Sequence, residues 1–286
     1  MVHGVRQSNS SRDPLWLQML LLSLAIGFVM LFLVLPVGII FSEALKDGWR
    51  TYVQALKDPA AWSAINLTIM VTAIAVPLNT VFGLAASWAI AKFEFRGKAF
   101  LLTLIDLPFA VSPVISGFIY VLLFGLQGSF GQTLSDWGFK VIFAVPGIVL
   151  VTIFVTFPFV ARELIPLMQE QGSDEEQAAI SLGARGWQTF FYVTLPNIRW
   201  GLLYGVILCN ARAMGEFGAV SVVSGSIRGK TATLPLHVEV LYNGFNVPAA
   251  FAMASLLAIV GLITLALKSL LEWKVKQHRR ELMTAD

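Results

Sequence analysis

Six long apolar stretches run through this sequence, with shorter polar segments between them. Each is about 20 residues or longer, which is the length that an α-helix needs to cross the hydrocarbon core of a bilayer. Because a lipid-embedded chain must satisfy its backbone hydrogen bonds internally, we expect helices and not an open sheet. The predicted fold class is therefore all-α, a polytopic membrane protein with about six transmembrane helices, at residues 15–41, 62–91, 99–126, 141–160, 200–224 and 248–271.

The remaining sequence predicts one membrane domain with short polar ends. Apolar residues make up 57% of the chain and charged residues 13%, which leaves no polar stretch long enough for a soluble domain. A charged start followed by an apolar run can be a secretory signal. The first apolar run is too long for one and lacks a small-residue cleavage site, so we expect it to be retained. The expected organisation is an N-terminal segment, a membrane domain and a polar tail, at 1–14, 15–271 and 272–286.

The distribution of basic residues predicts the orientation of the chain. Six spans put both termini on one side, and that side carries about twice as many lysines and arginines as the other. Since basic loops tend to stay inside, both termini and the polar insert at 172–196 are expected in the cytoplasm. The polar segments 42–60, 127–140 and 225–247 are expected on the outer side.

The polar insert at 172–196 reads GSDEEQAAISLGARGWQTFFYVTLP and stands between two apolar spans. Ser173 and Glu176 have the spacing of a capping box, and the acidic first turn suits the positive end of the helix dipole. Gly183 is expected to end this helix in a left-handed cap. A second short helix is expected to stop before Pro196, because the residue ahead of a proline avoids helical geometry. The prediction is a helix–glycine–helix on the membrane surface.

The insert also resembles a signature of ABC importers. Permease subunits of binding-protein-dependent importers carry E-A-A, three residues, G, nine residues and then I-x-L-P. This chain matches that spacing, except that Gln177 stands where glutamate is usual, with Glu176 one residue early, and Val193 replaces isoleucine. The resemblance implies that the insert is a coupling helix that docks into an ATP-binding subunit, whereas the alternative is an ordinary amphipathic loop helix. The implied coupling residues are Ser173, Glu175, Glu176, Gln177, Ala178, Ala179, Gly183, Leu195 and Pro196.

Three charged residues lie well inside the predicted spans, whereas a fourth, Lys268, lies near the end of its span. Arg212 and Glu216 are four residues apart, which puts them on one face of a helix. A charge at the bilayer centre costs about 2.5–3.5 kcal/mol on insertion scales, so such residues normally face protein or a water-filled path. We favour a mutual ion pair that locks this helix in the bundle over a polar lining or gate of a translocation path. Asp106 either lies near the cytoplasmic end of its span or partners Arg212.

Several small residues lie near predicted kinks. Pro108 and Pro113 interrupt the third span and free backbone carbonyls there. Ser112 and Ser221 are candidates to line a path for a hydrated oxyanion, as is Ser116, although serines in membrane helices more often bond their own backbone. Gly201 and Gly205 form a G-x-x-x-G pattern that favours close helix packing.

Other chemistry is not expected from this chain. The segment 225–231 looks like a phosphate-binding loop, but it has three residues between its glycines where the motif needs four. No nucleophile–base pattern is visible, so this chain is not expected to be an enzyme by itself. Three scattered histidines and the single Cys209 predict no metal site, and no basic stripe with aromatics points to nucleic acid.

Three further runs carry a wider resemblance. They are DLPFAVSP at 106–113, VTIFVTFPFV at 151–160 and NARAMGEFGAVSVVSG at 210–225, and they resemble sulfate/thiosulfate permease subunits of the CysW type. The resemblance implies a type I ABC importer (MetI-like) permease fold, forming half of a translocation pore in the bacterial inner membrane. The implied partners are a CysT-type second permease subunit, two ATP-binding subunits, a periplasmic sulfate-binding protein and membrane lipid. This chain would bind no cofactor, since ATP and Mg belong to the partner ATPase.

Three alternatives to this function stay open. The run at 212–218 also occurs in related molybdate permeases, so a molybdate/tungstate-type ABC permease is the first alternative. A stand-alone secondary transporter could use Asp106, Arg212 and Glu216 as a proton relay. An intramembrane enzyme is the third.

Overall fold

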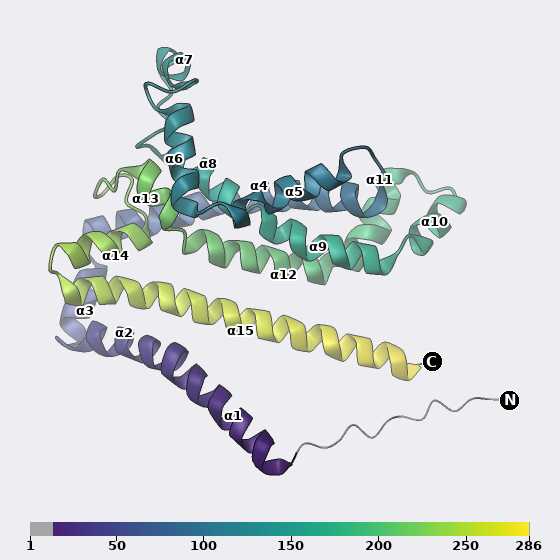
Figure 1. Cartoon of the computed structure of the whole chain (residues 1–286), viewed down its shortest axis with the longest axis horizontal. Coiled ribbons are helices and arrows are strands. Elements are labelled where there is room, and N and C mark those ends of the chain that lie inside the picture. The colour runs from purple at the N-terminus through teal and green to yellow at the C-terminus, as the bar shows by residue number, and fades with distance from the viewer. Residues whose placement is uncertain (1–13, 286) are drawn as a thin grey trace.

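The structure is a computed structural model that describes residues 14–285 and the side chains of residues 14–271. Within the described part of the chain, the regular elements are all helical, which confirms the predicted all-α class (Figure 1). In chain order they are α1 (Leu15–Val29), η1 (Met30–Val34), α2 (Leu35–Leu45), α3 (Trp49–Leu56), α4 (Pro59–Lys92), α5 (Lys98–Ala110), α6 (Pro113–Phe124), α7 (Gly131–Asp136), α8 (Val145–Thr156), α9 (Pro158–Gln171), α10 (Asp174–Ser181), α11 (Gly186–Thr189), η2 (Phe190–Thr194), α12 (Leu195–Met214), α13 (Gly218–Ser224), α14 (Leu234–Asn243) and α15 (Val247–Ala285).

Four helical stretches are long and apolar enough to cross a membrane by themselves. They are Leu15–Leu45, Pro59–Lys92, Val145–Gln171 and Val247–Leu271. Two further pairs of helices qualify together but are bent, by 107° between α5 and α6 and by 50° between α12 and α13. The described residues therefore provide up to six spans, in agreement with the predicted number.

The bend between α5 and α6 divides the stretch 99–126, which was expected to form one span. Ser112 takes an extended conformation, with φ −57° and ψ 136°, and Pro113 begins α6. A proline disfavours helical geometry in the residue before it, which explains where α5 ends. As a result, α6 and α7 project sideways from the bundle of α4, α5, α8, α9 and α12 (Figure 1).

The helices run between two ends of the bundle. The helices α10 and α11 lie at one end, together with the last turns of α15, and α3 and α14 lie at the other (Figure 1). The helix α4 runs between these ends and contributes residues to all four apolar clusters of the core. Because it packs against α8, α9, α12 and α14, α4 is well placed to transmit a movement from one end to the other.

Close helix packing on α9 depends on two glycines. A Cβ atom placed at Gly83 of α4 would lie 2.8 Å from Cβ of Val160, and one at Gly205 of α12 would lie 3.2 Å from the Cα of the same valine. Val160 is completely buried between them. The G-x-x-x-G pattern of α12 therefore serves packing, as predicted, since Gly201 is also in close contact with Leu167 of α9.

The helix expected to stop before Pro196 instead continues through it. The π-helical segment η2 precedes Leu195 and Pro196, and the N–H of Leu195 bonds to the carbonyl of Phe190. A proline ring clashes with the carbonyl four residues earlier in an α-helix, and the wider π turn relieves this clash. The segment η1 stands in the same position before Leu35 and Pro36. Both Leu-Pro pairs are thus accommodated without ending the helix.

Candidate functional site

The polar insert folds into the helix–glycine–helix that the sequence predicts. Gly183 follows α10 with a φ of +91°, and the N–H of Ala184 bonds to the carbonyl of Ala179 at 3.0 Å, which closes the left-handed cap. The predicted capping box at the start of α10 is wrong. Ser173 accepts a hydrogen bond from the side chain of Gln177 at 2.8 Å, and no first-turn amide bonds to its hydroxyl.

Glu176 makes long-range contacts in place of the capping bond. Its Oε2 lies 2.9 Å from Nζ of Lys92, the last residue of α4, and both side chains are largely buried. Its Oε1 accepts a hydrogen bond of 2.6 Å from the hydroxyl of Thr194, the last residue of η2. Glu176 therefore fastens α10 to the ends of two membrane helices, α4 and the one that contains η2 and α12.

Two more bonds complete this arrangement, which we call the coupling-loop cluster. Lys92 also donates to the carbonyl of Gly172, and Asn197 of α12 donates to the carboxylate of Glu175. The cluster consists of Lys92, Gly172, Glu175, Glu176, Thr194 and Asn197, and these residues border a polar cavity of about 440 Å³. Lys92 could not be assigned to this cluster from the sequence, because it lies far from the insert along the chain. Asn197 directly follows Pro196 but is not a position of the motif.

The structure sorts the nine predicted coupling residues by the direction they face. Glu176 faces the bundle through its contacts with Lys92 and Thr194, and Glu175 is exposed but bonds to Asn197 of α12. The apolar side chains of Leu182 and Trp187 are also exposed, by 89% and 57%. The exposed positions from the predicted set are Glu175, Gln177, Ala178, Gly183 and Pro196, and those partly covered are Ser173, Ala179 and Leu195.

Arg212 and Glu216 form the predicted ion pair, with Nη1 and Oε2 2.5 Å apart. Glu216 does not lie on the same helix as Arg212, however, because α12 ends at Met214 and α13 begins at Gly218. Its Oε1 accepts a bond of 3.0 Å from the N–H of Ala219 and so caps α13. The carboxylate is 2% exposed, which places this pair inside the bundle at the break of the fifth predicted span.

Asp106 does not pair with Arg212, which was one of the two placements that the sequence left open. Its carboxylate bonds to Nε of Arg162 on α9 at 2.8 Å and not to Arg212, and the guanidinium also lies 4.7 Å from the ring centre of Phe109. Both charged side chains are about half exposed. The sequence reading missed Arg162 because it ended the fourth span at residue 160, whereas the apolar helix pair α8–α9 continues to Gln171.

The serines near the breaks bond mostly to nearby backbone. Ser116 donates to the carbonyl of Ser112 at 3.2 Å, and Ser221 donates to the carbonyl of Gly218 at 2.8 Å. Ser112 itself is exposed where α5 meets α6. Among the described residues, no cluster of three or more His, Cys, Asp or Glu could hold a metal ion.

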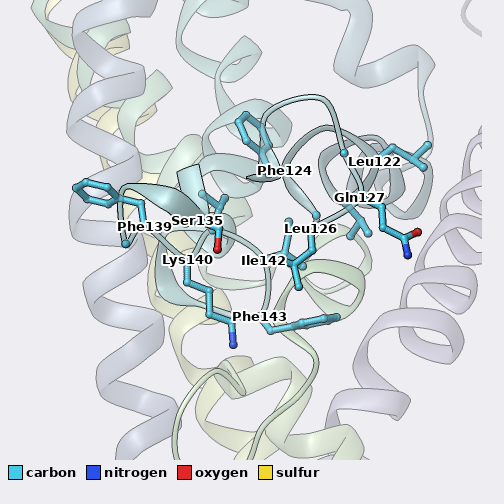
Figure 2. A pocket seen from close by; sticks show the side chains of 15 residues that line it. Leu122, Phe124, Leu126, Gln127, Ser135, Phe139, Lys140, Ile142 and Phe143 are labelled. Atoms are coloured by element: carbon cyan, nitrogen blue, oxygen red, sulfur yellow. The ribbon is translucent and has the colours of Figure 1, made fainter. Parts of the chain in front are cut away.

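A cavity of about 800 Å³ lies beside the projecting α6–α7 arm. Its wall is mostly apolar, with Lys140, Gln127 and Ser135 as polar exceptions, and Figure 2 shows the side chains around it. Phe143 lines the cavity with a φ of +57°, and its N–H bonds to the carbonyl of Val223 at 2.8 Å. This bond holds the loop before α8 against α13.

The fold and the coupling-loop cluster define a class of protein: a multi-pass membrane component with a polar helix hairpin fixed to the end of its helix bundle. The chain belongs to the family of binding-protein-dependent transport system inner membrane components, whose profile matches residues 79–277. It is therefore a permease component and not an enzyme by itself.

Characterised relatives match this chain over most of its length. It is 52% identical over 260 residues to the "Sulfate transport system permease protein CysW" of Synechocystis sp., which covers 91% of this chain and 94% of the relative. It is 53% identical over 248 residues to the protein of the same name from Escherichia coli K12, covering 87% and 85%. The "Sulfate transport system permease protein CysT" of that strain is 35% identical over 238 residues, covering 83% and 86%.

Solved structures show the same fold. A chain of a bacterial ABC transporter that imports the acidic polysaccharide alginate superimposes with a TM-score of 0.76 at 18% identity, covering 90% of this chain and 95% of that one. A chain of the alginate transporter in complex with an alginate-bound periplasmic protein gives a TM-score of 0.75 at 17% identity. At this level of identity the likeness concerns the fold alone.

Proposed function

We propose that this chain is the CysW-type permease subunit of an ATP-driven sulfate/thiosulfate importer and forms half of its translocation pore. The observation that carries the proposal is the identity of more than half over nearly full length to permeases named for sulfate transport. The partners would be a CysT-type permease subunit, two ATP-binding subunits and a periplasmic sulfate-binding protein. The chain would bind no cofactor, because ATP and Mg would reside in the ATP-binding subunits.

The coupling-loop cluster supports the way in which this subunit would receive its energy. The exposed residues around Gln177, Ala178 and Gly183 would contact an ATP-binding subunit. When that subunit moves on ATP binding, the Lys92–Glu176 pair would pass the displacement to α4, and the bonds from Thr194 and Asn197 would pass it to α12. Since α4 contributes to every core cluster, the whole bundle would respond as a unit.

The half-exposed pair of Asp106 and Arg162 supports the proposal that the face formed by α5 and α9 is turned toward the pore. A charged pair within a membrane-spanning bundle avoids lipid and normally faces protein or a water-filled path. The face formed by α5 and α9 would therefore meet the second permease or line the path between the two subunits. Arg212, which is about one third exposed, would belong to the same polar region, whereas the buried Glu216 would hold it in place.

The orientation follows from the placement of the loop. If α10 meets an ATP-binding subunit, that end of the bundle is cytoplasmic, as are both termini, and the protein resides in a bacterial inner membrane. The segments 42–60, 127–140 and 225–247 would then face the periplasm. The cavity beside the α6–α7 arm would lie on the side that meets the binding protein (Figure 2).

Reconstitution of the full importer into proteoliposomes tests the proposal. ATP hydrolysis should be stimulated by the sulfate- or thiosulfate-loaded binding protein and should be lost with Gly183→Asp or after deletion of residues 173–183. Stimulation by molybdate alone would favour the molybdate/tungstate-type permease. Uptake by this chain alone under an ion gradient would favour a secondary transporter and would contradict the proposal.

A further inference from the structure

A small internal cavity lies at the break between α12 and α13. Its volume is about 10 Å³, and it is bordered by α4, α8, α12, α13 and the residue before α14. This is about the space that one water molecule needs. The lining residues are Thr68, Val71, Thr152, Ala213, Met214, Glu216, Val220 and Thr233.

Two buried polar atoms of this lining have no hydrogen-bond partner among the described residues. They are Oε2 of Glu216, which makes only the ion pair with Arg212, and the hydroxyl of Thr233. Glu216 is 2% exposed and Thr233 4%. Burying a polar group without a hydrogen bond is costly, so the hydroxyl of Thr233 calls for a partner inside the cavity, whereas Oε2 of Glu216 already faces the guanidinium of Arg212.

Thr233 occupies a position where a threonine hydroxyl normally caps its own helix. It is the N-cap residue of α14, where a threonine usually accepts a bond from a first-turn amide. Here the second residue of the helix is Pro235, which has no N–H, and no first-turn amide bonds to the hydroxyl of Thr233. The N–H of Leu234 bonds to the hydroxyl of Thr68, on α4, at 2.8 Å. The hydroxyl of Thr233 is therefore available to the cavity.

The donors and acceptors around the cavity identify the chemistry of its occupant. The hydroxyl of Thr233 needs an acceptor for its proton, and Oε2 of Glu216 has room to accept a further bond beside the guanidinium of Arg212. The hydroxyl of Thr152 already donates to the carbonyl of Ile148 at 2.7 Å, so its oxygen can only accept a further bond. An occupant that accepts one hydrogen bond and can donate two matches this lining, and a water molecule has that capacity.

The charge at the site also favours a neutral occupant. Arg212 lies 2.5 Å from Glu216 and already neutralises the carboxylate. A metal cation would add an uncompensated charge to a buried site, which is strongly unfavourable. We propose that this cavity binds one internal water molecule, which accepts a bond from Thr233 and donates to Glu216 and Thr152.

This water would fix the bend of the fifth predicted span. Glu216 caps α13 through its Oε1, and the water would hold its Oε2 against α8 and the start of α14. Three segments that are distant in sequence would thus meet at one molecule. The site concerns the internal packing of the fold, and it does not depend on which anion is transported.

Valine substitutions in the assembled importer test the proposal. Thr72, on α4, is a matched control. Its hydroxyl is also buried and has no hydrogen-bond partner among the described residues, but it does not line the cavity. Thr233→Val should lower the midpoint of thermal unfolding by about 2–4 °C, whereas Thr72→Val should leave it unchanged or raise it. Thr233→Ser, which keeps the hydroxyl, should behave like the wild type. If Thr233→Val is as harmless as Thr72→Val, no water is bound and the proposal is wrong.

A structure of the wild-type importer at a resolution that shows ordered water provides a second readout. Density is expected about 2.7–3.2 Å from both Glu216 Oε2 and Thr233 Oγ1. A cavity without density, beside visible waters elsewhere in the protein, would overturn the proposal. The midpoint should not change when sodium is replaced by choline; saturable stabilisation by sodium that disappears in Thr233→Val would identify a cation and would equally overturn it.

Discussion

Nζ of Lys92, at the end of α4, lies 2.9 Å from Oε2 of Glu176 on α10, and both side chains are shielded from solvent. This pair joins the surface hairpin to the helix that runs through every apolar cluster of the core. Its partial burial distinguishes it from exposed surface pairs, which contribute about 0–1 kcal/mol to stability. The pair is a direct contact between α10 and α4, which are far apart in the sequence.

Removing the charge of Lys92 should uncouple the importer. In Lys92→Met the buried Glu176 keeps its charge without its cationic partner, so α10 loses its attachment to α4. We expect sulfate uptake by the reconstituted importer to fall at least about ten-fold, equivalent to about 1.4 kcal/mol. Basal ATP hydrolysis should persist.

Lys98 provides the matched control for this substitution. It pairs with Glu94 at 2.7 Å near the same end of the bundle, but Glu94 is 89% exposed. Lys98→Met should therefore leave uptake near the wild-type level, and the double exchange Lys92→Glu with Glu176→Lys should restore part of the lost activity. Equal effects of Lys92→Met and Lys98→Met would show that the buried pair has no special role.

Truncating Glu216 should destabilise the protein strongly. Glu216→Ala removes the carboxylate that pairs with the one-third-exposed Arg212 and that caps α13, and losing a hydrogen bond to a charged group costs about 1.5–3 kcal/mol. We expect a large drop in the thermal unfolding midpoint of the assembled importer, which fluorescence or calorimetry can measure. Asp106→Ala, which breaks a half-exposed pair, should cause a clearly smaller drop. A larger effect at Asp106 would contradict the assignment of Glu216 as the buried structural group.

The close approach of α4 and α9 predicts an effect at Gly83. In Gly83→Ala the new methyl group meets Val160 at 2.8 Å, and overpacking of this kind costs about 1–3 kcal/mol. Gly261→Ala, on α15 with open space around it, should be neutral or slightly stabilising. Both variants can be compared by thermal unfolding, and a stabilised Gly83→Ala would show that the two helices have room to separate.

Accessibility to a charged thiol reagent tests the polar face of α5 and α9. In a Cys209→Ser background, Asp106→Cys should react in the assembled importer, at a rate that changes when ATP is added. Leu262→Cys, on an exposed apolar position of α15, should face lipid and react at least about ten-fold more slowly. Similar slow rates at both positions would show that Asp106 does not face a water-filled path.

His237 on α14 predicts a dependence of stability on pH. Burial lowers the pKa of this histidine below its ordinary value of 6.5, Arg228 lowers it further, and Asp58 acts in the opposite direction. Because the folded state binds the proton less readily than the unfolded state, stability is present above pH 6.5 and is lost as the pH falls below it. The unfolding midpoint should therefore drop between pH 7.5 and 5.5, and the drop should be smaller in His237→Leu. An unchanged slope in that variant would rule out His237 as the cause.

Local sequence rules predicted those parts of the structure that local interactions determine. The Arg212–Glu216 pair and the left-handed cap at Gly183 involve residues within a few positions of one another, so spacing identified them, although Glu216 lies beyond the end of α12 and not on the same helix face as predicted. The all-α class followed from the length of the apolar runs, since a membrane helix needs a known number of residues. Of the two prolines expected to interrupt the third span, Pro113 stands at the break, whereas Pro108 lies inside α5. Spacing alone could not give the angle of 107°.

Contacts between distant parts of the chain were not predictable in the same way. Ser173 and Glu176 have the capping-box spacing, but Glu176 binds Lys92 and Thr194 instead, and these partners come together only when α4 and η2 pack against α10. The continuation through Pro196 was missed because the rule for prolines assumes an α-helix and does not anticipate a π turn. Arg162 was placed outside the fourth predicted span, which ended at residue 160. The helices α8 and α9 together continue to Gln171, beyond the range that composition suggested.

The central claim is that the coupling loop transmits energy from a partner ATPase to a sulfate pore. Uptake of radioactive sulfate into proteoliposomes that contain the complete importer tests it most directly, with wild-type and Lys92→Met subunits side by side. The account predicts uptake that requires both ATP and the binding protein in the wild type, and loss of uptake with retained basal ATP hydrolysis in Lys92→Met. Uptake without the ATP-binding subunits, or full uptake by Lys92→Met, would contradict it.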